Sequence, residues 1–264
     1  MNDFKKLETV VVDIKDFAAY VTLNRPETRN AMNMKMVQEI TGVFAALHDN
    51  RDIRAIVLSG AKGNFCSGGD IKEMRENPMP ASESAGNLDE MLRTVNQAPQ
   101  IVISKIQGAA LGGGFGLACV SDIAIADVDA KFGLPEVRLG IAPSFISPFV
   151  LQRIGLTRAR ELMLTGRRFS GKKAHEYGIV HIACEDNEIE HFLEIKLDEI
   201  KHCAPGAIAA VKELIFTVYQ TPLDETVDYR ANLLNSLRAG AEAQEGMLAF
   251  MEKRPAKWVT RRDS

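Results

Sequence analysis

Residues 106–136 read IQGAALGGGFGLACVSDIAIADVDAKFGLPE and combine a glycine cluster, a short apolar run and a single glutamate. Gly112, Gly113 and Gly114 lie between small apolar residues, so the backbone there can approach a ligand closely. Residues 115–120 are apolar and compatible with a helix, which predicts that the glycines lie at a helix N-terminus, where unpaired N–H groups favour negative charge. The N–H of Gly113 could then face an oxyanion. Close packing of a helix on a strand explains the same glycines without any ligand.

The glycine cluster does not match the usual nucleotide-binding loops. In each register of G-x-G-x-x-G, Leu117 or Cys119 stands where the last glycine belongs, and no GK[ST] sequence follows. The sequence therefore argues against a standard phosphate-binding loop.

Size and composition narrow the class of protein. The 264 residues are 46% hydrophobic, enough for one large domain or for a domain with a C-terminal appendage. A formal net charge of −3 gives no electrostatic reason to expect nucleic acid or an anionic membrane as partner. The start, MNDFKKLETV, lacks an apolar signal core, and the uncharged run around the glycines is too short to span a bilayer. These features predict a cytoplasmic protein.

The cysteines and histidines do not form a metal-binding or disulfide pattern. The four cysteines are far apart and without a CxxC pair, which predicts reduced thiols: Cys66, Cys119, Cys184 and Cys203. The five histidines show no HxH or HExxH spacing. We therefore expect neither a metal site nor a separate cofactor.

Hydrophobic periodicity predicts alternating strands and helices. Strands are expected at 7–14 and 18–23, joined as a hairpin at Lys15–Asp16, and at 55–58, 101–106 and 123–126. Apolar residues at helical spacing predict an amphipathic helix over 33–48. Asp70 is expected to cap a short helix that begins near Ile71. Residues 77–86 are expected to form a mobile loop that could act as a lid, followed by a helix at 88–97.

The second half of the chain is predicted to be mainly helical. The expected helices cover 145–154, 157–164, 171–177, 187–202, 205–219, 223–239 and 242–253. A strand, a glycine turn and a helix follow one another twice before this region, which is typical of an α/β fold. We predict a core over residues 1–199 and a helical C-terminal region over 200–264.

Several separated motifs, taken together, resemble the crotonase superfamily of enoyl-CoA hydratases and isomerases. They are LNRPETRNAMN at 23–33, FCSGGDIKEM at 65–74, ALGGGFGLACVSD at 110–122, FGLPEVRLGIAP at 132–143 and LTGRRFSGKKAHEYGIVH at 164–181. The resemblance covers nearly the whole chain. It implies a spiral of ββα units, a helical C-terminal trimerisation region, assembly as a trimer or as a hexamer of two trimers, and an acyl-coenzyme A substrate.

The resemblance also implies where the thioester is held. In this family two backbone N–H groups bind the thioester oxygen, and the matching positions are Gly69 and Gly113. One such fixed donor is worth about 3 kcal/mol when negative charge develops on that oxygen. Further substrate contacts are implied at Ala31, Ser67, Gly68, Asp70, Ile71, Lys72, Gly112 and Gly116. For Lys72, which would approach the adenine or phosphates of coenzyme A, a solvated helix lysine is the alternative.

One departure from the family pattern bears on the mechanism. Hydratases of this family usually carry two glutamates; Glu136 matches the second, but Gly116 stands where the first would be. Glu136 has apolar sequence neighbours, which could raise its pKa and make it a better base. One carboxylate can serve either hydration or Δ3,Δ2 isomerisation, and the missing partner favours isomerisation on chemical grounds.

The residues at 114–126 and 141–150 are similar to those of isohexenylglutaconyl-CoA and methylglutaconyl-CoA hydratases of acyclic terpene and leucine breakdown. Such substrates carry a second carboxylate, for which Arg138 is a candidate partner, although a solvated or inter-subunit ion pair explains Arg138 equally well. Our first hypothesis is therefore a hydratase of a branched 3-substituted glutaconyl-CoA, and our second is a Δ3,Δ2-enoyl-CoA isomerase. A non-catalytic acyl-CoA-binding or RNA-binding assembly is a third hypothesis, against which the acidic balance and Glu136 weigh.

Overall fold

The computed structural model describes residues 4–76 and 81–259, and of residues 81–86 the backbone alone. A six-stranded sheet forms its centre, in the order β1-β2-β3-β4-β6-β9. The strands are β1 (Val10–Lys15), β2 (Ala18–Leu23), β3 (Ala55–Gly60), β4 (Ile101–Ile106), β6 (Ile123–Asp127) and β9 (Ile182–Cys184). Only the β1–β2 pair is antiparallel, and the other neighbours in this sheet are parallel.

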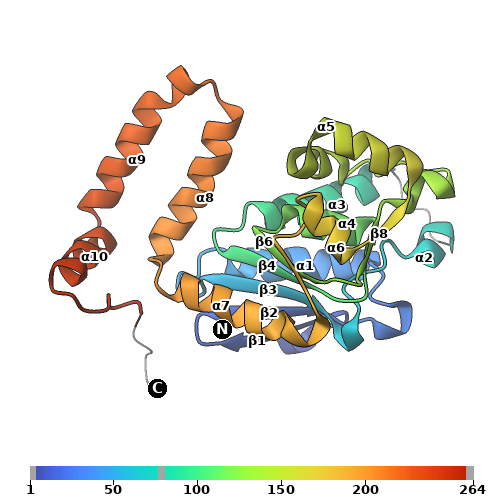
Figure 1. Cartoon of the computed structure of the whole chain (residues 1–264), viewed down its shortest axis with the longest axis horizontal. Helices are drawn as coiled ribbons and strands as arrows, with labels where there is room; N and C mark the ends of the chain where they lie inside the picture. The colour runs from blue at the N-terminus through green and yellow to red at the C-terminus, as the bar shows by residue number, and fades with distance from the viewer. Residues whose placement is uncertain (1–3, 77–80, 260–264) are drawn as a thin grey trace.

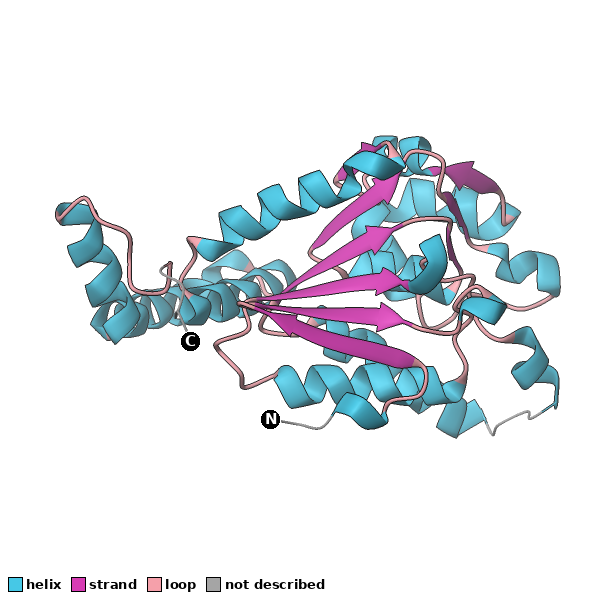
Figure 2. Cartoon of the chain, turned by 90° about the horizontal axis from the view of Figure 1, so that it is seen from below, coloured by secondary structure: helices cyan, strands magenta, loops and turns pink. Residues whose placement is uncertain are grey.

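The two faces of this sheet are covered by different helices (Figures 1 and 2). Along β3, Ile56 and Leu58 belong to the larger apolar core, while Ala55 and Val57 belong to the smaller one, because successive side chains of a strand point to opposite faces. Helices α1 (Met34–Leu47), α3 (Ala81–Asn96) and α4 (Gly113–Val120) pack in the larger core. Helix α7 (Ile189–Lys201) covers the opposite face.

The predicted N-terminal hairpin and first helix are confirmed. Val10 pairs with Leu23, and Asp16 takes a left-handed conformation at φ 52° in the turn. The strand begins at Val10 and not at residue 7, because a short 3-10 helix, η1 (Phe4–Lys6), precedes it. Asn33 caps α1 by accepting a hydrogen bond from the N–H of Met36 at 3.0 Å.

A second, three-stranded sheet lies beside the first. It joins strands from successive units of the chain, which is the spiral arrangement that the motifs implied. It contains β5 (Ala109–Leu111), β7 (Lys131–Gly133) and β8 (Arg168–Ser170). These strands and β9 have three residues each, too few to show a hydrophobic period, and the sequence analysis missed them. Isolated bridges between Met32 and Gly69 and between Cys66 and Ala110 continue this layer. Successive turns of the chain thus stack their loops next to one another.

The expected loop over residues 77–86 is wrong in part. Residues 77–80 lie outside the described residues, but α3 begins at Ala81, so six of the expected loop residues belong to a helix. The stretch ASESAGNL contains no proline, and its alanines and glutamate tolerate a helix whose apolar face is buried further along. Helix α2 (Ile71–Glu76) precedes this region, as predicted.

The helices after Glu136 follow the prediction, including the break expected near residue 155. The two helices expected at 145–154 and 157–164 are the two halves of α5 (Ser147–Thr165), which are separated at Gly155, where φ 71° and ψ 165° are not helical. Helix α6 (Gly171–Glu176) follows β8, and η5 (Asp186–Glu188) leads into α7. Helix α4 begins at Gly113, two residues before the apolar run that predicted it.

Helices α8 (Pro205–Gln220), α9 (Val227–Ala239) and α10 (Ala241–Met251) project away from the sheet (Figure 1). Lys212 anchors α8: its ammonium group is buried and donates to Asp122 Oδ2 at 2.6 Å and to the Gln100 carbonyl at 3.0 Å. Asp122 also accepts from the N–H of Val102 in β4 at 2.7 Å, so it links the start of that strand to Lys212. Large apolar side chains of this region are exposed, among them Val211, Ile215, Tyr219, Leu223, Leu234, Phe250 and Met251.

Candidate active site

The two glycine turns predicted to hold an oxyanion lie next to each other. The N–H of Cys66 donates to the Ala109 carbonyl at 2.7 Å, and the N–H of Leu111 donates to the Cys66 carbonyl at 3.0 Å. Just beyond this pairing, a Cβ built on Gly68 would lie 3.2 Å from the Leu111 carbonyl oxygen. Gly68 has φ 107°, a conformation that a residue with a side chain rarely adopts. Glycine is therefore needed for the turns to pack this closely.

The next turn of the spiral brings Glu136 to the same place. The N–H of Gly112 donates to the Gly133 carbonyl at 3.0 Å, which aligns β7 with β5. Pro135 opens a 3-10 helix, η4 (Pro135–Leu139), and places Glu136 at its second position. A Cβ built on Gly112 would lie 2.9 Å from Oε1 of Glu136. The carboxylate thus rests against the backbone that leads into α4.

Gly69 and Gly113 both present a backbone donor. Within residues 4–76 and 81–259, no group accepts a hydrogen bond from the N–H of either residue. Gly113 is the first residue of α4, where the helix dipole adds partial positive charge. A Cβ on Gly113 would lie 2.2 Å from Cε of Met32, so a side chain there would have to displace the end of that methionine. Both N–H groups are therefore available to donate to a ligand.

The environment of Glu136 favours a proton-accepting role. Its Oε2 atom is buried and has no hydrogen-bond partner in the described part of the chain. Burial raises the pKa of this carboxyl group above its ordinary value. Phe132 and Leu134 beside it are fully buried, whereas Val137 and Leu139 are exposed, so the expected apolar surroundings are formed on one side. Burial outweighs the hydrogen bond from the residue's own backbone amide, which acts to lower the pKa. A partly desolvated carboxylate with one oxygen free of partners is a suitable general base.

Arg25, which the sequence analysis did not single out, joins the turn at Ala31 to Asp70, the residue after Gly69. It donates to Asp70 Oδ2 at 2.9 Å and to the carbonyl of Ala31 at 2.6 Å. Burial opposes ionisation of Asp70, but the hydrogen bond from Arg25 and those from backbone amides outweigh it and lower the pKa of this carboxyl. Arg25 belongs to the motif LNRPETRN, whose charged residues gave the only signal for it.

The side chains of this loop that were predicted to contact the substrate either hold the loop itself or are exposed. Asp70 Oδ1 caps α2 by accepting from the amides of Lys72 and Glu73, both at 3.2 Å, as the sequence predicted. The side chains of Ile71 and Lys72 are exposed. Ser67 donates from its hydroxyl to the Thr28 carbonyl at 3.1 Å, so it fastens the loop to the preceding turn.

Gly116 and Arg138 lie in different surroundings from Glu136. Gly116 is buried, and a Cβ there would meet Cγ2 of Ile146 at 2.5 Å and Cδ2 of Leu92 at 3.5 Å. Arg138 is exposed and donates from Nε to the carbonyl of Thr165 at 3.0 Å, at the end of α5. The structure therefore brings Glu136 together with the two glycine turns, and holds Arg138 at the edge of η4.

Other reactive groups do not add to this site. Burial raises the pKa of Cys66 to about 11 and that of Cys119 to about 12, so neither thiol is a nucleophile near neutral pH. In the described ranges, no three His, Cys, Asp or Glu side chains are arranged to hold a metal ion. Among the same residues, no helix has the length and apolar character needed to cross a membrane.

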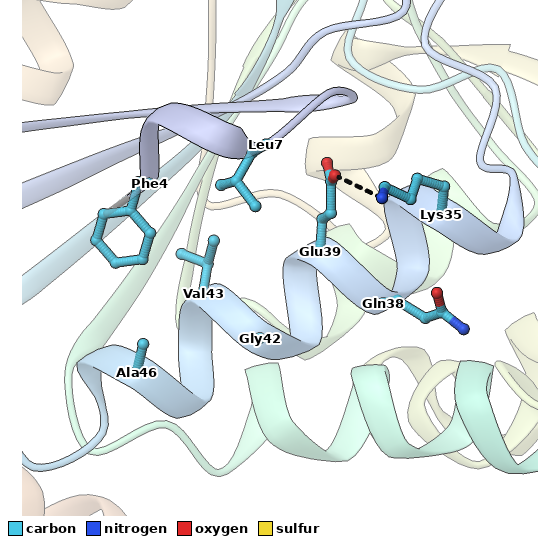
Figure 3. Close-up of a pocket in the computed structure, with 8 residues that line it drawn as sticks. All are labelled: Phe4, Leu7, Lys35, Gln38, Glu39, Gly42, Val43 and Ala46. Atoms are coloured by element: carbon cyan, nitrogen blue, oxygen red, sulfur yellow. Dashed lines mark ion pairs between the residues drawn. The ribbon is translucent and has the colours of Figure 1, made fainter. Parts of the chain in front are cut away.

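A separate apolar pocket lies between η1 and α1 (Figure 3). Its lining includes Phe4, Leu7, Val43 and Ala46, with Glu39 at one end. Burial opposes ionisation of Glu39, but hydrogen bonds from the Thr9 hydroxyl and neighbouring amides outweigh it and lower the pKa of this carboxyl. Because these bonds occupy both carboxylate oxygens, Glu39 holds the segment before β1 on α1 and is unsuited to act as a base.

Comparison with known proteins agrees with this geometry. The family model described as enoyl-CoA hydratase/isomerase matches residues 13–261. The probable enoyl-CoA hydratase EchA8 of Mycobacterium tuberculosis is 32% identical over 258 residues, which cover 96% of this chain and 99% of that protein. AtuE of Pseudomonas aeruginosa is 44% identical with a TM-score of 0.93, covering 96% of this chain and 100% of that chain. An enoyl-CoA hydratase/isomerase of Marinobacter aquaeolei is 40% identical with a TM-score of 0.92, covering 96% and 99%.

The predicted fold class is thereby confirmed. The mixed α/β core, its two stacked sheets and the helical C-terminal region match the crotonase-like architecture that the motifs implied. The match extends over nearly the whole chain and is not limited to the glycine turns. The chain belongs to the enoyl-CoA hydratase/isomerase family, within the crotonase superfamily.

Proposed function

We propose that this protein is an enoyl-CoA hydratase, which adds water to the double bond of an α,β-unsaturated acyl-CoA thioester. The observation that carries the proposal is the contact between the Glu136 carboxylate and Gly112, beside two glycine turns with unused N–H groups. The names of its relatives support this reaction: the M. tuberculosis protein and one from Clostridium acetobutylicum are named as enoyl-CoA hydratases.

In the proposed mechanism, the amides of Gly69 and Gly113 hold the thioester oxygen. Glu136 removes a proton from water as the water oxygen bonds to Cβ, and the electron pair of the double bond moves through Cα to the thioester oxygen. The enolate then re-forms the carbonyl as Cα takes the proton from Glu136. The carboxylate is restored, and one water molecule has been added.

An isomerase is the second candidate. With Gly116 in place of a second glutamate, Glu136 can also move a proton between two carbons of one acyl chain without consuming water. Both activities use the same oxyanion donors, so the geometry of the site alone supports either one. Comparing a 2-enoyl with a 3-enoyl thioester distinguishes them, because only hydration gives a 3-hydroxyacyl product and only isomerisation converts the 3-enoyl ester to the 2-enoyl ester.

For the acyl group we propose a branched 3-substituted glutaconyl-CoA, such as isohexenylglutaconyl-CoA. The support is the sequence similarity at 114–126 and 141–150, together with an arginine two residues after the base. Arg138 is exposed and donates from Nε to the Thr165 carbonyl. This hydrogen bond holds the side chain and leaves its two terminal nitrogens to bind another group. Such a guanidinium can bind the second carboxylate of the substrate.

Replacing Arg138 by alanine tests this substrate. We expect kcat/KM for 3-methylglutaconyl-CoA and isohexenylglutaconyl-CoA to fall by about 10- to 100-fold, the usual worth of a hydrogen bond to a charged group. The value for a straight-chain 2-enoyl-CoA should change by less than about twofold, because that substrate lacks the second carboxylate. Exposed Arg168 provides the control substitution. Equal losses on both substrate types would contradict the proposed contact.

The pH dependence follows from the buried carboxyl group. Glu136 acts as a base only when ionised, and burial raises its pKa, so kcat/KM should fall as the pH drops through that raised value. The activity is then lost at a higher pH than an ordinary glutamate would give. A pH profile on a 2-enoyl-CoA substrate measures this, and an acid limb at the ordinary glutamate value would count against a desolvated base.

We also propose that the C-terminal helices assemble the protein as a trimer or a dimer of trimers. Their exposed apolar side chains, Phe250 and Tyr219 among them, would be covered by neighbouring subunits. Sedimentation velocity should give a trimer or hexamer mass. A monomer at micromolar concentration would reject this assembly.

A further inference from the structure

The space beside Gly116 is filled by other parts of the chain. A Cβ on Gly116 would lie 2.5 Å from Cγ2 and 3.2 Å from Cβ of Ile146, and 3.5 Å from Cδ2 of Leu92. Ile146 is 2% exposed and Leu92 is fully buried, so neither side chain can turn into solvent to make room. The three atoms nearest to this position are all aliphatic carbons.

This filled space lies on the same helix as the Gly113 amide. Gly113 and Gly116 are one helical turn apart on α4, and residues at this spacing lie on neighbouring parts of one helix face. The missing side chain of Gly113 faces Met32, while that of Gly116 faces Ile146. A carboxylate on Gly116 would begin in the space that Ile146 takes up.

The position of Ile146 is determined by two helices. It is the residue before α5, and its carbonyl accepts a hydrogen bond from the N–H of Val150 at 3.0 Å, which places it in the first turn. Leu92 comes from α3, which packs against α4. Movement of Ile146 would therefore require a shift of the start of α5.

We infer that Ile146 fills the place of a second carboxylate and thereby leaves proton transfer in the active site to Glu136 alone. Ile146 and Gly116 form a matched pair, in which the isoleucine requires a glycine and the glycine leaves room for the isoleucine. This inference rests on the proposed function, because it assigns both proton transfers of hydration to one group. Glu136 takes one proton from the attacking water and returns one to Cα, so the carboxylate is regenerated without a second acid.

A double-mutant cycle tests the matched pair. Glycine to alanine inside a helix ordinarily stabilises a protein, but Gly116→Ala should lower the melting temperature because its Cβ collides with Ile146. Ile146→Ala removes Cγ2, so Gly116→Ala should lower the melting temperature less in the double variant than it does alone. The difference between the two effects should exceed the error of measurement. Gly42 in α1 is the matched control, since a Cβ there meets nothing within 4 Å and Gly42→Ala should raise the melting temperature. Additive effects at Gly116 and Ile146 would overturn the pair.

The number of ionisations tests the chemical part. If Glu136 alone transfers protons, kcat/KM of the wild-type protein should show one acid limb and no alkaline limb from a second carboxyl group. Two ionisations in the carboxyl range, with hydration observed, would overturn the inference and leave the proposed function standing. If the wild-type protein hydrated no enoyl thioester, the proposed function would be overturned. The assignment of both proton transfers to Glu136 would then fall as well.

Discussion

Replacement of Glu136 by glutamine is expected to lower kcat for hydration of a 2-enoyl-CoA by about 10³-fold or more, within the range of about 10²- to 10⁴-fold that a positioned acid-base group contributes. The loss is large because one carboxylate serves both proton transfers, and a glutamine amide can neither accept the proton of water nor return one to Cα. Binding of the acyl-CoA should change little, since the oxyanion donors are backbone groups. Steady-state kinetics and calorimetric titration with a saturated acyl-CoA measure the two effects separately.

The stability of the Glu136→Gln variant provides the control for this loss. Oε2 of Glu136 is buried without a partner, and the pKa of this carboxyl group is raised. The ionised form therefore lowers the stability of the native state at neutral pH. Removing the charge should leave the melting temperature at neutral pH unchanged or higher. Exposed Glu225, substituted in the same way, should affect neither quantity. A kcat within tenfold of wild type would show that another group is the base.

Replacement of Gly112 by alanine is the second change with a large expected effect. Gly112 has φ 50° and ψ −116°, and a Cβ there would lie 2.9 Å from Oε1 of Glu136. The substitution therefore strains the backbone that carries the Gly113 donor and pushes the carboxylate aside. We expect kcat/KM to fall by about 10²- to 10³-fold, as when one oxyanion donor is lost, and the free energy of unfolding to fall by about 1–3 kcal/mol.

Gly178→Ala is the control that separates backbone strain at Gly112 from the contact with Glu136. The φ of Gly178 is 75°, so alanine there is also strained, but a Cβ would meet nothing within 4 Å, and the residue lies in the turn before β9. Gly178→Ala should lower stability and leave kcat/KM unchanged. If Gly112→Ala kept more than a tenth of the wild-type kcat/KM, the contact between Gly112 and Glu136 would not matter for catalysis.

Elements with a strong local signal were predictable from the sequence. The hairpin around Asp16, the helix capped by Asn33 and the cap at Asp70 all depend on residues within a few positions of one another. The three-residue strands β5 and β7 carry no such signal, because their formation depends on pairing with distant turns of the spiral. The start of α3 at Ala81 was missed because a Ser- and Gly-containing stretch was interpreted as loop.

Residue types at the site were predictable, but their contacts were not. Motif resemblance pointed to Gly69, Gly113 and Glu136, and the structure places the Glu136 carboxylate against the turn between Gly112 and Gly113. That Ile146 lies against Gly116 could not be inferred, because the two are 30 positions apart and belong to different helices or their ends. The Arg25–Asp70 pair was likewise hidden, since its partners are separated by 45 residues.

The most direct test of hydration at a site with one glutamate is turnover of a 2-enoyl-CoA in oxygen-18 water, with wild-type protein and Glu136→Gln side by side. Isohexenylglutaconyl-CoA, 3-methylglutaconyl-CoA and a straight-chain ester should be compared, with a 3-enoyl-CoA alongside. We predict that the wild-type protein places the label at Cβ of the product and that the variant places almost none. Conversion of the 3-enoyl ester to the 2-enoyl ester without label, and no labelled product from any 2-enoyl ester, would contradict the hydratase and favour the isomerase.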